Sequence, residues 1–380
     1  MPRTVLFVHS SSGRYGADRQ LSLLARGLDP VRYRPLVVLP EPGELGPELA
    51  EAGVEVVIRE LSVLRRSLLG ARGLAAVAGA AARDGVVLGR LIRRRGVALV
   101  HSNTSVVLGG AAAAARARVP HVWHVREIYA RYGRAWPAYR RALLSAAALP
   151  CVSAATAAQF GRAENVCVIG DGLALDPHRA PRERARAALG LPEGPAAIAV
   201  LGRISDWKGQ DVLVRALAEP PLRELGVLGL LAGEPWPGAE ERLQAVRDLA
   251  RELRVEDRLH VLGFRADLEN VLGAAEVVAV PSTAPDPLPG AAIEAAAAGC
   301  AVIASAHGGL PEIICDGQTG RLVAPADASA LARAAGELIG DGGLRERLGA
   351  AAAVDVRTRY RADRLLETMQ ALYDQVLARS

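Results

Sequence analysis

The sequence predicts an α/β protein built from two parallel-sheet domains, and three observations support this fold class. The first is length, because 380 residues exceed what one hydrophobic core usually serves. The second is composition, since 51% of the residues are hydrophobic, as in a folded globular protein. The third is a regular alternation of short apolar runs with amphipathic stretches, which is typical of a parallel sheet covered by helices on both faces.

The first half of the chain starts this alternation. TVLFVHS (residues 4–10) reads as a short buried strand, a glycine-punctuated loop follows, and a helix then places Leu21, Leu24 and Leu28 on one face. Further strands are expected at RPLVVLP (34–40), VEVVIRE (54–60), VALVHSN (97–103) and HVWHV (121–125). The rhythm breaks at residues 169–182, where Gly, Asp and Pro accumulate, so we predict a domain boundary near residue 172.

The second half resumes the same pattern. Strand-like runs are expected at AAIAVLGR (196–203), VLGLLAGE (227–234), RLHVLGF (258–264), EVVAVPS (276–282) and CAVIASA (300–306). In open parallel sheets, ligands bind outside the carboxyl ends of the strands. The polar and glycine residues that follow these strands are therefore the candidate binding residues.

Charge is distributed unevenly along the chain. Residues 1–170 hold 23 arginines against 11 acidic residues, a net charge of +12, whereas residues 171–380 carry −7. A basic half is suited to nucleic acid, anionic lipid or a phosphorylated small molecule. Nucleic acid is disfavoured, because aromatic residues for base stacking make up only 4% and no nucleic-acid motif is present.

Targeting and metal-binding patterns are missing from the sequence. No apolar run reaches the roughly 18 residues that span a bilayer, and the first residues lack a signal-peptide pattern, so we expect a cytoplasmic protein. The four cysteines, at 151, 167, 300 and 315, lack the spacing of a zinc site or a disulfide framework. There is no Asp-x-Asp element, and we expect neither a metal nor a cofactor.

The stretch LGRISDWKGQD (201–211) holds the only lysine of the chain, Lys208, among 46 basic residues. A solvated remnant of a composition bias is one interpretation. The other is functional: Lys is a compact point charge, whereas Arg is a planar fork, and a tight anion site can require the former. Arg203 and Lys208 follow a predicted strand, where two cations can clamp a diphosphate.

The second candidate stretch is PSTAPDPLPGAAIEAAAAGCAVIAS (281–305). It runs from a strand through a proline-rich loop into a helix that begins near residue 290, and N–H groups at a helix start bind anions. Glu294 lies one turn into that helix, where a carboxylate can accept hydrogen bonds from both hydroxyls of a ribose. The alternative is a first-turn glutamate that merely suits the helix dipole.

These motifs resemble the retaining glycosyltransferases of family 4, also called glycosyl transferases group 1. GRYGADRQLSLLARGL resembles the glycine loop and first helix of the family, and the donor domain is matched by GRISDWKG, GEPWPG, LGFRADLENVLGAAEVVAVPS, DPLPGAAIEAAAAGCAVIAS and GGLPEIICDGQTGRLV. The resemblance implies the GT-B fold, with two Rossmann-like domains facing an interdomain cleft. It implies an acceptor-binding domain at 1–172, a donor-binding domain at 173–357, and a C-terminal helix, 358–380, that returns to the first domain.

The family signature of two carboxylates separated by seven residues falls on Asp286 and Glu294. The resemblance assigns Glu294 to the ribose hydroxyls and Asp286 to a hydroxyl of the donor sugar. It assigns Arg203 and Lys208 to the diphosphate, which makes Lys208 the phosphate-binding lysine of the family. The other donor-binding residues that it implies are Gly16, Gly202 and Arg265.

Two positions depart from the family pattern. Asp286 is one methylene shorter than the usual glutamate, so the contact with the sugar is shifted. Pro289 replaces a common glycine and has no N–H to donate, so the phosphate-binding amides fall on Gly290 and Ala291. The donor sugar, and the choice between a UDP- and a GDP-sugar, stay open.

In the first domain, PHVWHVREI resembles the strand-end histidine of the family, which lies beside the transferred sugar. His124 is the matching residue, and His121 then belongs to the strand itself. His101, Asn103 and Arg126 also follow strand ends and are predicted to contact the acceptor.

The resemblance implies a metal-independent hexosyltransferase that retains the anomeric configuration. Its acceptor is a hydroxyl, either of a lipid-linked cell-surface glycan or of a small natural product such as an antibiotic. The basic first domain favours the glycan, and so does peripheral attachment to the inner face of an anionic membrane. A sugar-nucleotide 2-epimerase and a catalytically inactive nucleotide-sugar-binding protein are the rival interpretations.

Overall fold

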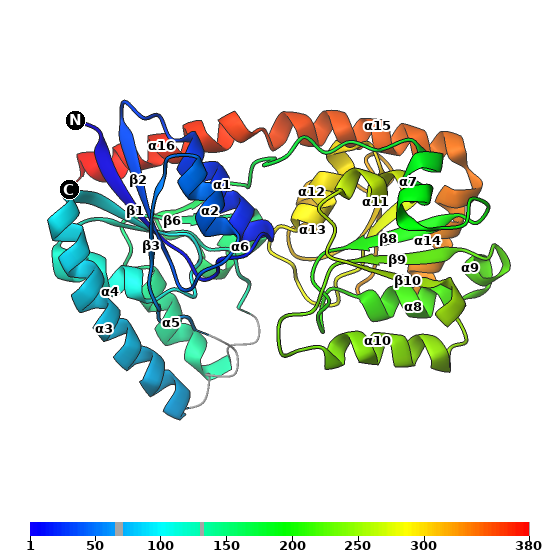
Figure 1. Cartoon of the computed structure of the whole chain (residues 1–380), viewed down its shortest axis with the longest axis horizontal. Helices are drawn as coiled ribbons and strands as arrows, with labels where there is room; N and C mark the ends of the chain where they lie inside the picture. Colours follow the sequence, from blue (N-terminus) through cyan, green and yellow to red (C-terminus); the bar gives the residue numbers. More distant parts are fainter. Residues whose placement is uncertain (65–70, 130–132, 380) are drawn as a thin grey trace. The chain divides into compact units, whose positions relative to one another are not determined.

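The computed structural model describes residues 1–64, 71–129 and 133–379 and divides the chain into two compact units (Figure 1). Unit 1 comprises residues 1–174 together with 362–380, and unit 2 comprises residues 175–361. Both are Rossmann-like α/β units with a parallel sheet. The divisions fall within a few residues of the predicted ones at 172/173 and 357/358.

Unit 1 contains a five-stranded parallel sheet in the order β3-β2-β1-β4-β5. The strands are β1 (Arg3–Val8), β2 (Tyr33–Leu39), β3 (Glu55–Ile58), β4 (Val97–Ser102) and β5 (His121–Trp123). A second, two-stranded parallel sheet pairs β6 (Leu149–Cys151) with β7 (Val166–Val168). The helices are α1 (Gly16–Gly27), α2 (Leu45–Glu51), α3 (Ala71–Arg95), α4 (Gly109–Ala117), α5 (Trp136–Leu143), α6 (Ala154–Ala157) and α16 (Ala362–Ala378), with 3-10 turns at Gly133–Ala135 and Ala158–Phe160.

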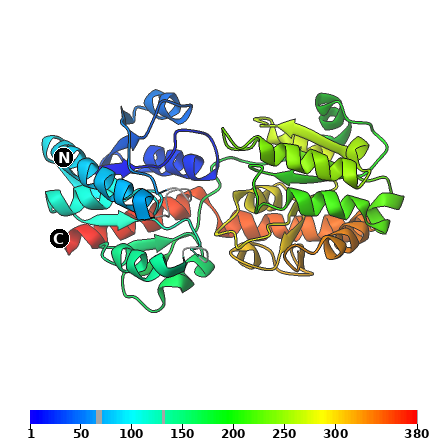
Figure 2. The same cartoon turned by 90° about the horizontal axis from the view of Figure 1, so that it is seen from below.

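Helices flank the unit 1 sheet (Figure 2), and apolar side chains pack against both faces of that sheet. On one face, the predicted leucines in α1 and directly after it are buried together with residues of the C-terminal helix α16, such as Met369 and Tyr373. On the other face, Leu88 and Ile92 of α3 pack with residues of α4. The helix α16 is therefore part of the core of unit 1, although it is the last element of the chain.

Unit 2 contains a six-stranded parallel sheet in the order β10-β9-β8-β11-β12-β13. Its strands are β8 (Ala197–Leu201), β9 (Leu228–Ala232), β10 (Leu259–Gly263), β11 (Val277–Val280), β12 (Ala301–Ser305) and β13 (Arg321–Val323). Its helices are α7 (Arg182–Leu189), α8 (Gln210–Ala218), α9 (Pro220–Glu224), α10 (Glu241–Glu252), α11 (Leu268–Ala274), α12 (Gly290–Ala297), α13 (Leu310–Ile313), α14 (Ala328–Gly340) and α15 (Gly342–Arg359), with a 3-10 turn at Glu256–Arg258.

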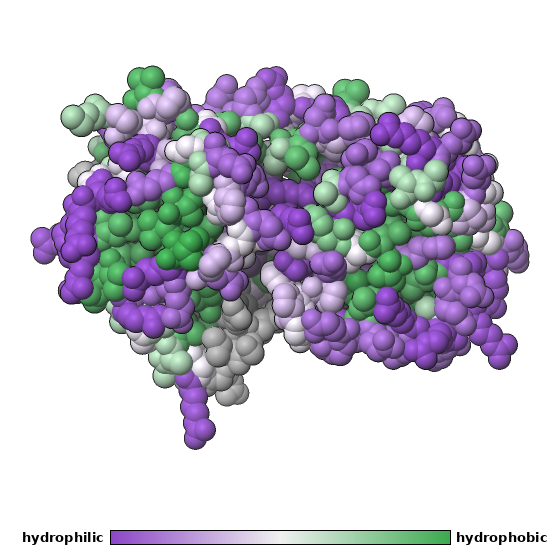
Figure 3. Space-filling model, viewed as in Figure 1, coloured by the Kyte–Doolittle hydropathy of each residue, from purple (hydrophilic) through white to green (hydrophobic). Residues whose placement is uncertain are grey.

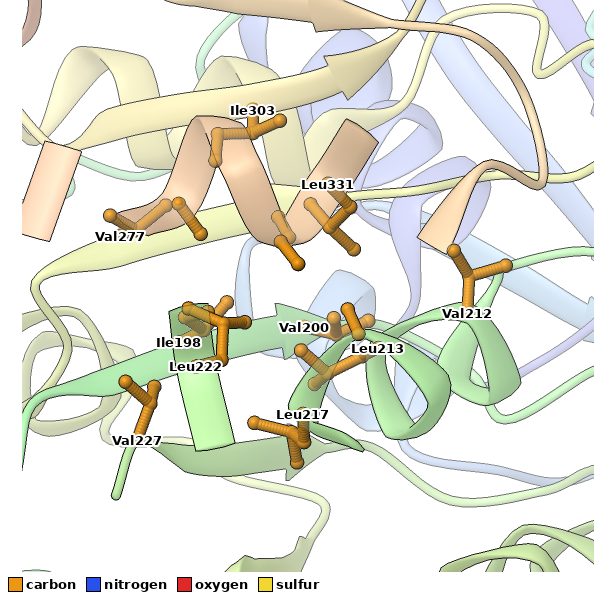
Figure 4. Close-up of a cluster of buried hydrophobic side chains, with 14 of the residues drawn as sticks. Ile198, Val200, Val212, Leu213, Leu217, Leu222, Val227, Val277, Ile303 and Leu331 are labelled. Atoms are coloured by element: carbon orange, nitrogen blue, oxygen red, sulfur yellow. The ribbon is translucent and has the colours of Figure 1, made fainter. Parts of the chain in front are cut away.

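The core of unit 2 lies between the sheet and the helices α8 and α14. Figure 4 shows Ile198 and Val200 of β8 facing Leu213 and Leu217 of α8, with Leu331 of α14 nearby. All five side chains are buried. This apolar packing fixes the strands, and with them the loops that leave the carboxyl edge of the sheet.

Hydrophilic and apolar residues both reach the visible surface of each unit (Figure 3). An apolar area lies on unit 1 where Figure 1 places β3 and α3, and Ile58 at the end of β3 is 45% exposed. In the described ranges, no helix has both the length and the apolarity needed to cross a membrane.

Candidate functional site

The loop between β8 and α8 positions the two predicted cations of unit 2. Gly202 has φ +114° and Gly209 has φ +76°, values that L side chains rarely adopt. A Cβ atom at Gly209 would lie 1.9 Å from the carbonyl oxygen of Pro281, directly after β11. Trp207 O also accepts a hydrogen bond of 2.8 Å from Thr283 N. The residue between these two contacts, Lys208, is thereby fixed against the segment that follows β11.

Lys208 forms an ion pair with Asp286, 78 residues further along the chain. The Nζ–Oδ2 distance is 2.7 Å, and the side chains are 20% and 5% exposed. The ammonium group also lies 4.4 Å from the centroid of the Trp207 ring. The backbone of Asp286 is held in turn, since its carbonyl oxygen accepts a 2.8 Å hydrogen bond from Gly309 N. Two residues predicted to bind a donor thus lie in direct contact.

The other predicted cations of unit 2 differ in their surroundings. The Arg203 guanidinium lies 3.5 Å from the centroid of the Trp236 ring, and the Arg203 carbonyl oxygen accepts from Gln210 Nε2 at 2.9 Å. Arg265 donates from Nε and Nη2 to the carboxylate of Asp267, at 2.8 and 2.5 Å, and this bidentate contact lowers the pKa of Asp267. The charge of Arg265 is therefore already compensated within its own loop.

Helix α12 begins at Gly290, as predicted, with Pro289 as the preceding residue. The N–H groups of Gly290 and Ala291 belong to the first turn and have no partner within the helix. Glu294 is half-buried one turn further on. His307, which the motif analysis did not single out, places its ring Nε2 2.8 Å from the carbonyl oxygen of Ser282 and so ties the loop after β12 to the loop after β11.

In unit 1, a buried hydrogen-bond chain lies at the carboxyl edge of the sheet. His9 Nε2 is 2.9 Å from Asp18 Oδ1, and Ser11 Oγ donates to the same oxygen at 2.5 Å. Burial raises the pKa of Asp18, but hydrogen bonds from His9, Ser11 and the backbone N–H of Tyr15 outweigh it, so the pKa lies below its ordinary value. His9 and Asp18 were not predicted as site residues, although Asp18 lies within the segment GRYGADRQLSLLARGL.

Gly16 starts α1 on the same edge, and a capping box between Tyr15 and Asp18 closes the first turn. Asn103, one residue beyond β4, donates from Nδ2 to Ala17 O at 3.1 Å and lies 3.3 Å from His9 Nδ1. The Asn103 side chain is therefore bound to the first turn of α1, which begins at Gly16.

The histidines of β4 and β5, and His124 directly after β5, are all buried. His101 Nδ1 is 2.5 Å from the hydroxyl of Tyr373 in α16, and its ring lies 5.5 Å, centroid to centroid, from that of His124. His121 contacts Ser102 Oγ at 2.9 Å. Burial lowers the pKa of His101 and of His124 well below the ordinary value and lowers that of His121 to about 3, so the three rings are neutral.

Arg126 forms a buried ion pair with Asp171. The distance from Nη1 to Oδ1 is 2.5 Å, and the side chains are 7% and 14% exposed. Arg126 Nε also donates to the carbonyl oxygen of Asn103 at 3.0 Å. The neighbouring Glu127 accepts a hydrogen bond from the hydroxyl of Ser105, and burial raises the pKa of the Glu127 carboxyl group.

Buried polar atoms without a hydrogen-bond partner concentrate at this edge of unit 1. Over 90% of buried polar groups in proteins are normally paired. Within the described part of the strand-end segments 101–104 and 123–126, the unpaired atoms are His101 Nε2, Asn103 Oδ1, Thr104 Oγ1, Trp123 Nε1, Arg126 Nη2 and both ring nitrogens of His124. A polar ligand is one way to satisfy such a cluster.

Metal ligands do not gather in the described part of the chain, where no group of three His, Cys, Asp or Glu side chains is arranged to hold an ion.

Comparison with known proteins matches both units to glycosyltransferases. Residues 181–355 match the family described as glycosyl transferases group 1, and residues 15–176 match glycosyltransferase family 4. The two matches cover most of both units. The chain belongs to the group 1 glycosyltransferases of family 4.

Curated relatives include D-inositol 3-phosphate glycosyltransferases. The protein of Nocardia farcinica is 37% identical over 216 residues, which are 55% of this chain and 48% of that protein. The protein of Mycolicibacterium smegmatis is 40% identical over 159 residues, which are 41% of this chain and 36% of that protein. The chain thus spans about half the length of the curated relatives it matches, or less.

Solved structures match over nearly the whole chain. Anabaena Alr3699/HepE, in complex with UDP and glucose, is 25% identical with a TM-score of 0.82 over 97% of this chain and 99% of that chain. Sucrose-phosphate synthase of Thermosynechococcus elongatus, at 21% identity, has a TM-score of 0.79 with full coverage of both chains. The fold is therefore that of the GT-B glycosyltransferases.

Proposed function

We propose that this protein is a glycosyltransferase that moves a hexose from a nucleotide diphosphate sugar to a hydroxyl group. The observation that carries the proposal is the Lys208–Asp286 contact of 2.7 Å at the carboxyl edge of the unit 2 sheet, where the matching family motif binds its donor. The N–H groups at the start of α12 and Glu294 complete a set suited to phosphates and a ribose. The complexes of Anabaena Alr3699/HepE with UDP and with UDP-glucose favour UDP over GDP as the nucleotide.

The proposed reaction retains the anomeric configuration. The bond between the anomeric carbon and the β-phosphate oxygen breaks, the acceptor oxygen forms a bond from the same face, and the acceptor proton passes to the departing β-phosphate. Arg203 and Lys208 stabilise the negative charge that develops there. No motif places a carboxylate beneath the anomeric carbon, which a covalent intermediate requires, so we favour front-face attack.

The two cations take the role that a metal ion has in other glycosyltransferases, so we propose a metal-independent reaction. Turnover should be unchanged in excess EDTA. Loss of turnover on chelation, restored by Mg²⁺ or Mn²⁺, would contradict this part of the proposal.

For the acceptor, we propose a hydroxyl-bearing compound of cell-surface glycan or glycolipid synthesis. The positive charge of unit 1 supports an enzyme that works on the cytoplasmic side at an anionic membrane. The relatives named D-inositol 3-phosphate glycosyltransferases favour a second candidate, a small polyol. A natural-product acceptor is the remaining alternative.

The test is a calorimetric titration with UDP-glucose, UDP and GDP-mannose, followed by product analysis with a panel of acceptors. We expect the dissociation constant to differ between the nucleotides. For the nucleotide that binds most tightly, it should rise at least tenfold in Lys208→Ala. Donor turnover that releases a free altered sugar without any acceptor would indicate a 2-epimerase. Donor binding without turnover in any mixture would indicate a nucleotide-sugar-binding protein.

A further inference from the structure

Two of the unpaired polar atoms in unit 1 belong to residues that contact each other. Asn103 and Arg126 are linked by the 3.0 Å hydrogen bond from Arg126 Nε to the Asn103 carbonyl oxygen. Asn103 is fully buried, and the Arg126 side chain is 7% exposed. Asn103 Oδ1 and Arg126 Nη2 nevertheless have no hydrogen-bond partner. The chemistry of a ligand that would satisfy them can be read from their surroundings.

The orientation of the Asn103 amide is determined by its neighbours. A backbone carbonyl oxygen only accepts hydrogen bonds, so the atom 3.1 Å from Ala17 O must be the amide nitrogen. The same nitrogen faces His9 Nδ1, and His9 Nε2 faces the carboxylate of Asp18. His9 therefore carries its proton on Nε2 and accepts on Nδ1. Through this chain, His9 and Asp18 position Asn103 so that Oδ1 is an acceptor.

The charge of Arg126 is compensated. Its Nη1 group donates to Asp171 at 2.5 Å, and the pair is almost completely buried. The unpaired Nη2 group is then a hydrogen-bond donor within a pair that is neutral overall. An anion that approached Nη2 would also approach the carboxylate of Asp171, which is bound to Nη1 of the same guanidinium, and that carboxylate would repel it.

We propose that Asn103 Oδ1 and Arg126 Nη2 form a hydroxyl-binding pair that receives an uncharged polyol or sugar acceptor, and that Asp171 excludes its phosphorylated counterpart. A hydroxyl both donates and accepts, so it can donate to Asn103 and accept from Arg126. The dianion of a phosphate monoester only accepts hydrogen bonds. Both atoms are covered by neighbouring side chains, so binding includes side-chain rotation of the kind common at binding sites.

This inference rests on the proposed function and sharpens it. The curated relatives are named for a phosphorylated polyol, D-inositol 3-phosphate. The compensated charge of Arg126 indicates an uncharged acceptor for this chain instead. Asp171 is then a specificity-determining residue, and His9 and Asp18 are positioning residues.

The first arm of the test needs no turnover. The full chain is saturated with UDP to occupy the donor site, and inorganic phosphate is titrated by calorimetry. We expect no saturable phosphate binding to the wild type up to about 10 mM. Asp171→Asn should gain a phosphate site at least tenfold tighter, because Arg126 is no longer compensated, and Asp171→Asn with Arg126→Gln should lose it again.

The matched control for this arm is Asp176→Asn, which removes an exposed carboxylate paired with Arg357 in unit 2 and should gain no phosphate site. Phosphate binding by the wild type that disappears in Arg126→Gln would overturn the inference. So would an Asp171→Asn variant with wild-type UDP affinity and unfolding midpoint that binds no phosphate.

The second arm compares acceptors that accelerate UDP release from UDP-glucose, taken in matched pairs such as myo-inositol with D-inositol 3-phosphate and glucose with glucose 6-phosphate. We expect kcat/KM to favour the uncharged member at least tenfold, and Asp171→Asn to narrow that preference. A preference for the phosphorylated member overturns the inference while leaving the proposed function intact. Absence of any UDP-glucose turnover counts against the proposed function, and the phosphate arm still decides this inference.

Discussion

Lys208 shows at the scale of one residue why a single lysine persists among 45 arginines. Its ammonium group contacts one oxygen of the Asp286 carboxylate, Oδ2, at 2.7 Å. A point charge of this kind can turn from a carboxylate toward a phosphate by rotation of a flexible stem, whereas a guanidinium fork favours a fixed bidentate geometry. The pair thus provides a counter-ion for the cation when no donor is bound.

From this we predict that Lys208→Ala and Arg203→Ala each lower kcat/KM by about two orders of magnitude, the usual effect of removing a preorganised group that stabilises charge. Lys208→Arg should also be impaired. Steady-state rates of UDP release provide the measurement. The matched control is Arg242→Ala, which breaks a surface pair with Asp206 and should stay within about twofold of the wild type. A near-normal rate in either cation variant would remove the diphosphate assignment.

His124 allows a second residue-scale prediction, on stability. Both ring nitrogens are buried and unpaired, and each unsatisfied group costs about 1 to 3 kcal/mol. His124→Leu removes these groups at similar volume and should raise the free energy of unfolding by about 1 kcal/mol while turnover falls. His121→Leu is the control, because it deletes a made bond to Ser102 and should not stabilise. Denaturant titration measures both variants, and a loss of stability in His124→Leu would refute the prediction.

Sequence patterns indicate single candidate residues better than they indicate the contacts between those residues. Lys208, Arg203 and Asp286 were predicted from strand ends and from family motifs. The contact between Lys208 and Asp286 was not, because it depends on the register of two strand-end loops. The chain from Asp18 through His9 to Asn103 was missed for a similar reason: its members are spread over β1, α1 and β4 and share no local pattern.

At the scale of elements, the apolar runs predicted the long strands and the helices α1 and α12. Three strands were missed: β6, β7 and β13. Each has only three residues, LPC, VCV and RLV, which is too short for hydrophobic periodicity to separate a strand from a loop. Whether these three segments form strands depends on the strands that they pair with rather than on their own sequence.

The loop between β8 and α8 provides an element-scale prediction. Gly209→Ala adds a Cβ atom that would meet the Pro281 carbonyl oxygen at 1.9 Å, in a backbone conformation with φ +76°. We expect the free energy of unfolding to fall by about 2 kcal/mol or more, and UDP affinity to fall with it because Lys208 is displaced. Gly226→Ala is the control, with φ +61° and open space around the new Cβ. It should cost about 1 kcal/mol and leave UDP affinity unchanged. Calorimetry measures the UDP affinity of both variants. An equal loss of UDP affinity in Gly209→Ala and Gly226→Ala would contradict this geometry of the loop.

At the scale of the whole molecule, unit 1 should be the acid-sensitive unit. The pKa values of His101 and His124 lie well below the ordinary value of 6.5, and that of His121 is about 3. These rings stay neutral in the folded state, whereas the unfolded chain binds three protons below pH 6.5. Stability is therefore fully present above pH 6.5 and is lost as the pH falls below it.

Two carboxyl groups of unit 1 act in the opposite direction. Burial raises the pKa values of Glu127 and Asp171, so the folded state takes up protons there before the unfolded state does. The unfolded state therefore binds three extra protons at the histidines, and the folded state binds up to two extra protons at the carboxyl groups. From this difference we expect the unfolding free energy of unit 1 to fall by about 1 to 4 kcal/mol per pH unit below pH 6.5. Denaturant titrations at pH 7.5 and 5.5, followed by fluorescence of the buried Trp123, measure this slope, and equal midpoints at both values would refute it.

Attachment to membranes is the last whole-molecule prediction. Helix α3 ends with three exposed arginines, Arg93 to Arg95, of which Arg95 pairs with Glu55 at 2.5 Å. Two other segments are also rich in arginine, RRSLLGARG from Arg65 and RYGRAWPAYRRALLSAA from Arg131, but residues 65–70 and 131–132 lie outside the described residues. Trp136 and Tyr139 are half-buried and pack on Tyr129, so they contribute less to a headgroup interface than their sequence position indicates.

The prediction of membrane attachment therefore rests on the arginines at the end of α3. Each arginine near an anionic surface contributes about 1 kcal/mol, and the attraction is screened by salt. The protein should co-sediment with anionic vesicles at low salt and detach as salt rises over roughly one decade, and Arg93→Glu with Arg94→Glu should weaken the attachment at least tenfold. Arg247→Glu, on an exposed helix of unit 2, is the matched charge reversal and should have little effect. Equal partitioning onto neutral and anionic vesicles, or none onto either, would move the acceptor away from the membrane and toward a small molecule in solution.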